Sequence, residues 1–155
     1  MILGFKEKFP WGESTYFREN ILLNTKIHAI LEDRRNRWKA GMGIQMVYRG
    51  GKYFFKEHFS DGIPRLERCL GVQKIQIKNC NNIAIDDYVG IILNYTLKNE
   101  EYQSYIMVYI DDKPLNKTSI MRLAKNEGFD SVEQFLRCFK SNFTGKIIHW
   151  TNHLY

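Results

Sequence analysis

The chain from residue 24 to residue 41 reads Asn24-Thr25-Lys26-Ile27-His28-Ala29-Ile30-Leu31-Glu32-Asp33-Arg34-Arg35-Asn36-Arg37-Trp38-Lys39-Ala40-Gly41, and the predicted fold is organised around it. Its first part, from Thr25 to Leu31, is rich in apolar and β-branched residues without Gly or Pro, which predicts a strand. Its second part is a basic loop around one aromatic ring, with Arg34, Arg35, Arg37 and Lys39 surrounding Trp38. Such a strand and loop suit an anionic, planar ligand, and a solvated charged loop is the alternative.

The composition is that of one folded domain spanning residues 1–155. The sequence is 44% hydrophobic and 14% aromatic, which fits a globular chain and not a disordered one. The formal net charge of +6 favours an acidic partner, nucleic acid before membrane. No apolar run approaches the roughly 18 residues of a membrane helix, and Met1 to Lys6 is too short and too soon charged for a signal peptide. We therefore expect no membrane partner; the oligomeric state is left open.

The spacing of cysteine and histidine predicts neither a disulfide framework nor a metal site. Cys69, Cys80 and Cys138 are odd in number and widely spaced, which is typical of a protein of the reducing cytoplasm. His149 and His153 are four residues apart, but in an extended segment they would lie ~13 Å apart, too far to share an ion. We expect no metal and no cofactor.

The hydrophobic patterns predict an α+β fold in which strands dominate the middle of the chain and pair mainly antiparallel. A small mixed barrel with about three flanking helices fits this order, and an open sheet is also compatible with it. Predicted strands cover residues 2–6, 25–31, 44–48, 52–59, 66–78, 88–97, 102–110 and 145–151.

Capping residues and apolar spacing mark the three predicted helices. The first should bury Phe17, Ile21 and Leu22, the second should end at a C-cap glycine, Gly128, and the third should present a buried face at 132, 135, 136 and 139. The predicted N-caps are Ser14 or Thr15, Asn116, and Asp130 or Ser131.

Two hairpins are predicted in the strand-rich middle of the chain, with turns at Gly50-Gly51 and at Asn99-Glu100-Glu101. The arm at 102–110 is apolar on both faces, which places it inside the sheet. Its tyrosines either pack in the core or form a base-stacking platform, and aromatic stripes favour the core.

Within the opening stretch, the pattern Asn-x-Lys-x-x-Ala-x-Leu, followed by Trp-Lys-x-Gly, resembles the signature strand of the ASCH family, whose fold is similar to the PUA domain. Lys26 matches the family lysine. Trp38, Lys39 and Gly41 match the entry to the next strand. The resemblance implies a PUA-like barrel over nearly the whole chain.

The chain departs from the family pattern at three positions of the same strand. Asn24 stands where the family has Gly, Ala29 where it has Thr, and Leu31 where it has Arg. Two of the four signature side chains, the hydroxyl and the guanidinium, are therefore missing.

A second block, from Leu123 to Ser131, resembles the ASCH helix that supplies the family's catalytic glutamate, and Glu127 matches that position. The residue also has an independent physical interest. It lies one residue before the predicted C-cap glycine, where a carboxylate is unfavourable by ~0.3–1 kcal/mol. A partner such as Lys26 would offset this cost, so we expect Lys26 and Glu127 to face one pocket; an exposed Glu on a frayed last turn is the alternative.

In ASCH members with amidohydrolase activity, the resemblance implies a lysine, a threonine and a glutamate acting on N4-acetylcytidine. Because Ala29 has no hydroxyl, the sequence favours a nucleotide- or RNA-binding module with a Lys/Glu cleft and a degenerate catalytic signature. The alternative is an amidohydrolase for an acylated nucleoside, with Lys26 and Glu127 as catalytic residues and water as nucleophile; a ribonuclease is a minor variant. The expected ligand is RNA or a modified nucleoside or nucleotide. The ligand-binding candidates are Lys26, His28, Arg34, Arg35, Arg37, Trp38, Lys39 and Trp11.

Overall fold

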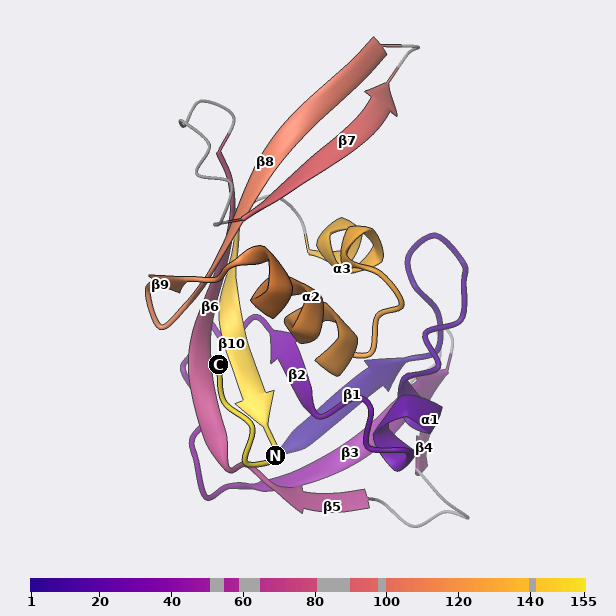
Figure 1. The fold of residues 1–155 in the computed structure, drawn as a ribbon. Coiled ribbons are helices and arrows are strands. Elements are labelled where there is room, and N and C mark those ends of the chain that lie inside the picture. The colour runs from indigo at the N-terminus through magenta and orange to yellow at the C-terminus, as the bar shows by residue number, and fades with distance from the viewer. Residues whose placement is uncertain (51–54, 59–64, 81–89, 98–99, 140–141) are drawn as a thin grey trace.

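The computed structural model describes residues 1–50, 55–58, 65–80, 90–97, 100–139 and 142–155, and shows an α+β fold (Figure 1). The helices are α1 (Phe17–Leu22), α2 (Lys117–Asn126) and α3 (Val132–Cys138). The strands are β1 (Ile2–Lys6), β2 (His28–Leu31), β3 (Gly43–Gly50), β4 (Phe55–His58), β5 (Arg65–Arg68), β6 (Gly71–Asn79), β7 (Ile91–Leu97), β8 (Glu100–Ile110), β9 (Lys113–Pro114) and β10 (Phe143–His149).

The strands form two sheets. In the first, β1 runs parallel to β3 on one side, and β4 and β5 pair antiparallel with β3. The second has the order β2-β10-β6-β8-β7, with β9 beside β8, and all its neighbours are antiparallel. The prediction of a mainly antiparallel α+β fold with three helices is confirmed.

The predicted barrel closure is not found, because in the part of the chain that the structure describes neither sheet closes. The backbone N–H groups of Ile27 and Ile30, at the edge of β2 away from β10, are bound by the end of α2 and not by another strand. The strand predicted over 66–78 is also two strands. It breaks at Cys69 and Leu70, where the chain passes from the first sheet to the second.

The helix signals of the second half of the chain are confirmed. The side chain of Asn116 accepts the Ser119 N–H, and that of Ser131 accepts the Gln134 N–H. Gly128, with φ of +89°, follows the last turn of α2. Its N–H and that of the next residue turn back to carbonyls of the helix, which is a Schellman ending.

The start of α1 differs from the prediction. Its N-cap is Tyr16, in a left-handed conformation and without a side-chain cap. The Thr15 hydroxyl instead donates to the Lys6 carbonyl at 2.6 Å and accepts the Phe17 N–H at 3.4 Å. Leu22, expected on the buried face, is 48% exposed.

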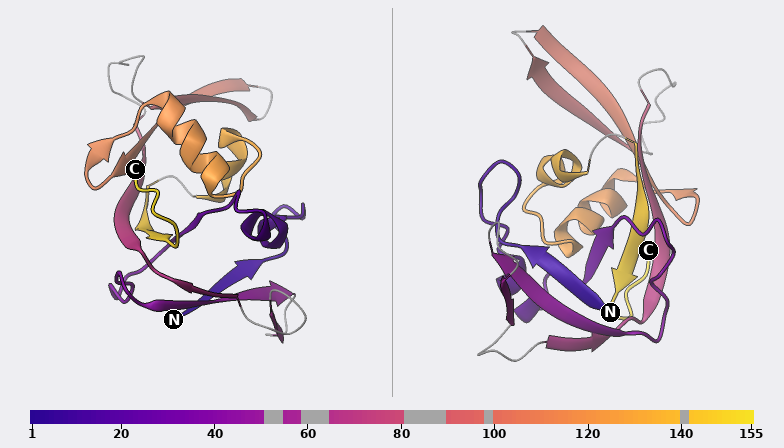
Figure 2. Two further views of the ribbon diagram at one scale, coloured as in Figure 1. Left: turned by 60° about the horizontal axis from the view of Figure 1, so that its bottom comes forward. Right: turned by 180° about the vertical axis from the view of Figure 1, so that it is seen from behind.

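The core has two parts. One lies between α2, α3 and the helix-facing side of the second sheet, with Ile75, Ile147 and Phe135 among its buried residues. The other lies where the first sheet covers one end of the opposite side of the second sheet, with Leu3, Trp38 and Ile148 among its members. Figure 2 shows the two helices and the first sheet on different sides of the second sheet, with the β7–β8 hairpin projecting from the body.

Candidate functional site

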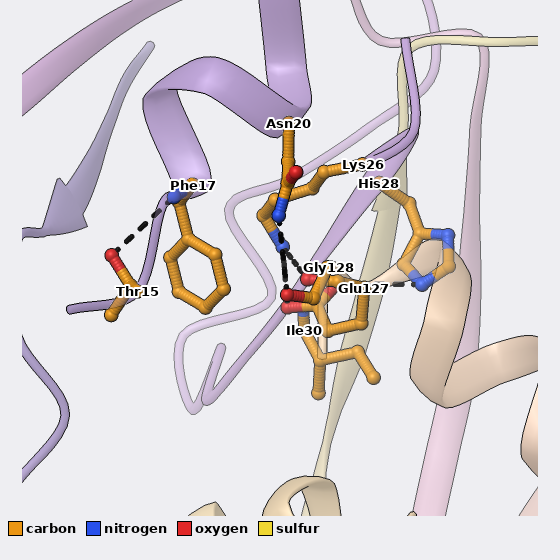
Figure 3. A network of polar contacts seen from close by, with 8 residues as sticks. All are labelled: Thr15, Phe17, Asn20, Lys26, His28, Ile30, Glu127 and Gly128. Atoms are coloured by element: carbon orange, nitrogen blue, oxygen red, sulfur yellow. Dashed lines mark hydrogen bonds and ion pairs between the residues drawn. The ribbon is translucent and has the colours of Figure 1, made fainter. Parts of the chain in front are cut away.

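Lys26 and Glu127 form a buried ion pair between the residues that precede β2 and the end of α2. The Lys26 Nζ lies 3.0 Å from Glu127 Oε1 and donates to the Glu127 carbonyl at 2.6 Å (Figure 3). The two residues are 1% and 5% exposed. The expectation that they meet is confirmed, and the alternative of an exposed Glu127 on a frayed turn is wrong.

This pair resolves the unfavourable position of Glu127 at the C-cap of α2. The ammonium of Lys26 binds both the last carbonyl and the carboxylate, so a cation sits at the negative end of the helix. Glu127 Oε1 also accepts the Ile30 N–H at 3.1 Å, and the Asn126 carbonyl accepts the Ile27 N–H at 3.0 Å. The end of α2 thus binds the edge of β2.

Aromatic rings and the end of α1 enclose Lys26. Its Nζ lies 4.5 Å from the centre of the Phe17 ring and 5.6 Å from that of Phe5, within cation–π range. The Asn20 carbonyl accepts the Lys26 N–H, and the Asn20 side chain donates to the Gly128 carbonyl (Figure 3). These contacts surround Lys26 with protein groups.

Burial is the main electrostatic influence on the pair. It raises the pKa of Glu127 to about 7, against the opposing effects of the Lys26 charge and the Ile30 N–H. It also lowers the pKa of Lys26, and the attraction of Glu127 offsets this in part. Glu127 therefore exchanges its proton near neutral pH, as a general acid or base does.

Two histidines extend the buried polar cluster. The Nε2 of His28 lies 3.3 Å from Glu127 Oε2, and its ring centre is 5.5 Å from those of His149 and Tyr155. The ring nitrogens of both histidines and Glu127 Oε2 are buried without a hydrogen-bond partner. Burial lowers the pKa of His28 well below 6.5 and that of His149 to about 4, so both rings are neutral at pH 7.

Sequence reasoning missed the place of His149 and Tyr155 in this cluster. His149 lies directly opposite His28 in the register of β10 and β2, a pairing of residues 121 positions apart that no local pattern signals. The Asn126 side chain binds the Tyr155 hydroxyl at 2.8 Å, which brings the last residue of the sequence to the end of α2.

The pair does not line the cavity that the described structure shows beside α2. This cavity, of about 1020 Å³, has residues of α2 in its wall, together with Thr25, Tyr105 and Gly128. Lys26 and Glu127 are not among its lining residues. The pair lies behind this wall, enclosed in the protein.

The basic loop between β2 and β3 is built on Asp33, which the core fixes in place. Its two carboxylate oxygens accept the backbone N–H groups of Arg37 and Trp38, each at 3.0 Å. Burial opposes ionisation, but these hydrogen bonds, with the charges of Arg37 and Lys146, hold the pKa of Asp33 below its usual 3.8. The Asp33 carboxylate therefore holds the loop in one conformation at neutral pH.

The cations of this loop point into solvent. Arg34, Arg35, Arg37 and Lys39 are all exposed. Arg34 pairs with Glu32 at 2.9 Å, an exposed contact that contributes little to stability. The four cations predicted to bind the ligand thus lie in one short segment, whose backbone is bound by Asp33.

The two tryptophans do not offer the stacking surface that was expected. Trp38 is 4% exposed and belongs to the core between the sheets, because Asp33 turns the chain inward at this residue. Trp11 is partly buried, stacked on Phe9 with ring centres 4.8 Å apart and with the Arg137 guanidinium 4.5 Å from its ring centre. Trp38, named from the sequence as a ligand-binding candidate, is therefore a core residue.

Two further features bear on the expected partners. Among the residues that the structure places, no three His, Cys, Asp or Glu side chains are arranged to hold a metal ion. No helix in that part of the chain is long and apolar enough to cross a membrane. Comparison with protein-family models, with curated proteins and with solved structures finds no match for this chain.

Proposed function

We propose that this protein is an RNA- or nucleotide-binding module of the ASCH type, which contacts its ligand through the basic loop between β2 and β3. The observation that carries the proposal is the group of four exposed cations that Asp33 holds in one segment. Because Asp33 binds the backbone of the loop at Arg37 and Trp38, the exposed cations project from a defined backbone toward phosphate groups.

Two features of the described structure support the resemblance to the ASCH family: the Lys26–Glu127 pair and the conformation of Asn24. Lys26 and Glu127, which match the family's lysine and glutamate, meet at 3.0 Å although they are 101 residues apart. Asn24, which stands at the family's glycine, has φ of +56°, a conformation that Gly adopts most readily and Asn next. Both are what a chain with this family's local architecture would show.

In this proposal, Lys26 and Glu127 join α2 to β2 and do not contact the ligand. Lys26 is 1% exposed, and its ammonium is already bound to the carboxylate, the carbonyl and the ring of Phe17. A ligand could reach it only after the pair separates, which leaves buried charges without partners.

A salt titration of RNA binding tests the proposal. Replacing Arg34, Arg35 and Arg37 together with Ala should weaken binding to a single-stranded RNA and lower the salt slope by up to ~2, at ~0.7 for each phosphate that is no longer neutralised. A matched control removes the same charge from exposed lysines outside the loop, Lys8, Lys117 and Lys125. An affinity that ignores salt, or equal losses in both triple variants, would contradict a specific role for the loop.

An amidohydrolase acting on an acylated nucleoside is the second candidate. It is favoured by the pKa of Glu127 near 7 and by the Oε2 atom of that residue, which has the His28 ring 3.3 Å away but lacks a hydrogen bond of standard geometry. It is opposed by Ala29, which is buried among apolar side chains and has no hydroxyl. Incubation with N4-acetylcytidine decides it, since turnover that Glu127→Gln abolishes would establish the enzyme, and cleavage of the RNA probe would indicate the ribonuclease.

A further inference from the structure

The second sheet has an outer face, turned away from α2 and α3, that is apolar and covered at one end and polar at the other. At the covered end, Ala29, Ile148 and Val72 lie side by side in the register of β2, β10 and β6, under the first sheet. The next row on the same face, two residues along each strand, is Lys146 beside Lys74. The composition of the face changes there, from buried aliphatic side chains to cationic ones.

The polar end consists of three successive rows of side chains from β10, β6 and β8. Because paired residues share a face, the register places Lys146 with Lys74, Thr144 with Gln76 and Tyr109, and Lys78 with Met107. Their inward neighbours Ile75, Ile77 and Val108 are buried in the core, which confirms the direction of the alternation. We call this set of partly or fully exposed residues the open face: Lys74, Gln76, Lys78, Tyr109, Thr144 and Lys146.

The open face adjoins the basic loop. The last residue of β2, Leu31, pairs with Lys146, and the loop starts at the next residue. The Lys146 charge contributes to the low pKa of Asp33 inside the loop. The right-hand view of Figure 2 shows the chain after β2 passing along the side of β10 and β6 that is away from the helices.

The joined surface carries a positive net charge. The open face carries Lys74, Lys78 and Lys146, and the loop adds its four cations. Among the residues that the structure describes, the acidic side chains beside these cations are Glu32, Asp33, Asp111 and Asp112. Arg34 pairs with Glu32 at 2.9 Å, Arg37 with Asp33 at 4.0 Å and Lys74 with Asp112 at 2.7 Å. Seven cations against four carboxylates leave a net charge of +3 for these groups.

Tyr109 places an aromatic ring in the middle row of the open face. Lys78 lies 4.9 Å from the centre of this ring, and the Tyr109 hydroxyl donates to the Met107 sulfur at 3.3 Å. Both contacts lie within the face and so orient the ring among the lysines. Tyr105, four residues earlier on the same strand, is buried, whereas Tyr109 is partly exposed.

We propose that a single-stranded RNA segment lies across the open face, with its phosphates against Lys146, Lys74 and Lys78 and a base on Tyr109. This inference rests on the proposed function. It specifies where the ligand binds and that the ligand is single-stranded. A sheet face with cations spaced along the strands and one central ring matches a flexible strand with splayed bases. Lys74 and Lys78 are four residues apart on one strand, or ~13 Å, so they would reach different phosphates.

Fluorescence anisotropy with a labelled oligouridine tests the inference. Tyr109→Ala should raise the Kd about 5- to 150-fold, the effect of losing one stacked base, whereas Tyr109→Phe should keep the natural affinity. Replacing Lys78 and Lys146 together with Ala should lower the salt slope by ~1.4. Circular dichroism and urea unfolding establish that each variant is folded before its affinity is compared.

Each other outcome has a definite meaning. If the natural protein binds oligouridine and the loop variants weaken it, but the open-face variants do not, this inference is overturned and the proposed function stands. If a duplex of the same length binds more tightly than the single strand, stacking on Tyr109 is wrong. If the natural protein binds no RNA, this inference is overturned; if it binds no nucleotide either, or binds only anionic lipid vesicles, both proposals fall.

Discussion

Replacing Lys26 by methionine removes one partner of the buried ion pair and keeps a long, flexible side chain in its place. The change leaves the Glu127 carboxylate buried at 5% exposure, with the Ile30 N–H as its remaining hydrogen-bond donor among the described contacts. It also removes the donor to the last carbonyl of α2, 2.6 Å from the Lys26 Nζ. Both losses fall on the junction between α2 and β2.

The cost of Lys26→Met should depend on pH, because Glu127 can take up a proton. With Lys26 absent, the pKa of Glu127 rises further above its value of about 7, since the lysine charge opposes the effect of burial. At pH 8 a charge is left unpaired or a proton is taken up, and we expect a loss of about 2–3 kcal/mol, about 1.4 kcal/mol more than at pH 6. At pH 6 the carboxyl is protonated, and the loss should shrink to about 1–2 kcal/mol, the value of the missing hydrogen bond and packing.

The sign of this dependence follows from proton binding. Between the unfolded pKa of 4.5 and the raised folded value, the folded state holds more protons than the unfolded chain. Its stability therefore falls as pH rises through that window, by at most about 1.4 kcal/mol per pH unit. The window ends near pH 7 in the natural protein and extends to higher pH in the variant.

Urea unfolding followed by circular dichroism at pH 6 and pH 8 measures both effects. Lys8→Met is the control, since Lys8 is exposed. Adding Glu127→Gln to Lys26→Met should recover stability at pH 8, because the amide oxygen still accepts the Ile30 N–H without a charge. The reasoning is refuted if Lys26→Met costs under about 1 kcal/mol at both pH values, or if its cost is the same at both.

Three further changes follow from the same structure. Gly128→Ala should lower the free energy of unfolding by about 1–3 kcal/mol, because φ is +89° and a Cβ would lie 3.2 Å from the Lys26 side chain. Gly43→Ala, whose Cβ meets nothing within 4 Å, is the matched control, and equal effects would contradict the argument. Ala29→Thr should cost about 1–3 kcal/mol in urea unfolding, because its hydroxyl enters the apolar core between the sheets, and an unchanged stability with gained amidohydrolase turnover would reverse that view. His149→Phe should flatten the dependence of the free energy of unfolding on pH between pH 4.5 and 6.5. In the natural protein, the lowered pKa values of His28 and His149 remove stability as pH falls and the raised pKa of Glu127 adds it, so stability should fall by about 1.4 kcal/mol for each unit that the pH is lowered. The same slope in the variant, measured by urea unfolding, would show that His149 is uninvolved.

Local signals in the sequence were sufficient for much of the secondary structure. Asn116, Ser131 and Gly128 act through hydrogen bonds that span three to five residues. Because these bonds are local, the residue types alone predict where the helices begin and end. Alternation of apolar and polar residues likewise placed Ile75 and Ile77 inward and Lys78 outward. The meeting of Lys26 with Glu127 was also predicted, from a family resemblance and from the cost of a carboxylate at a helix end.

Burial and long-range pairing were decided by the tertiary structure alone. Trp38 lies in a loop of charged residues, and only its place between two sheets makes it a core residue. The approach of His28 to His149, and the end of α2 binding the edge of β2 where a barrel would add a strand, depend on contacts about 100 residues or more apart in the chain. The residue pattern of a segment indicates whether its side chains are buried or exposed. Which other segment contacts it depends on how all the elements pack together.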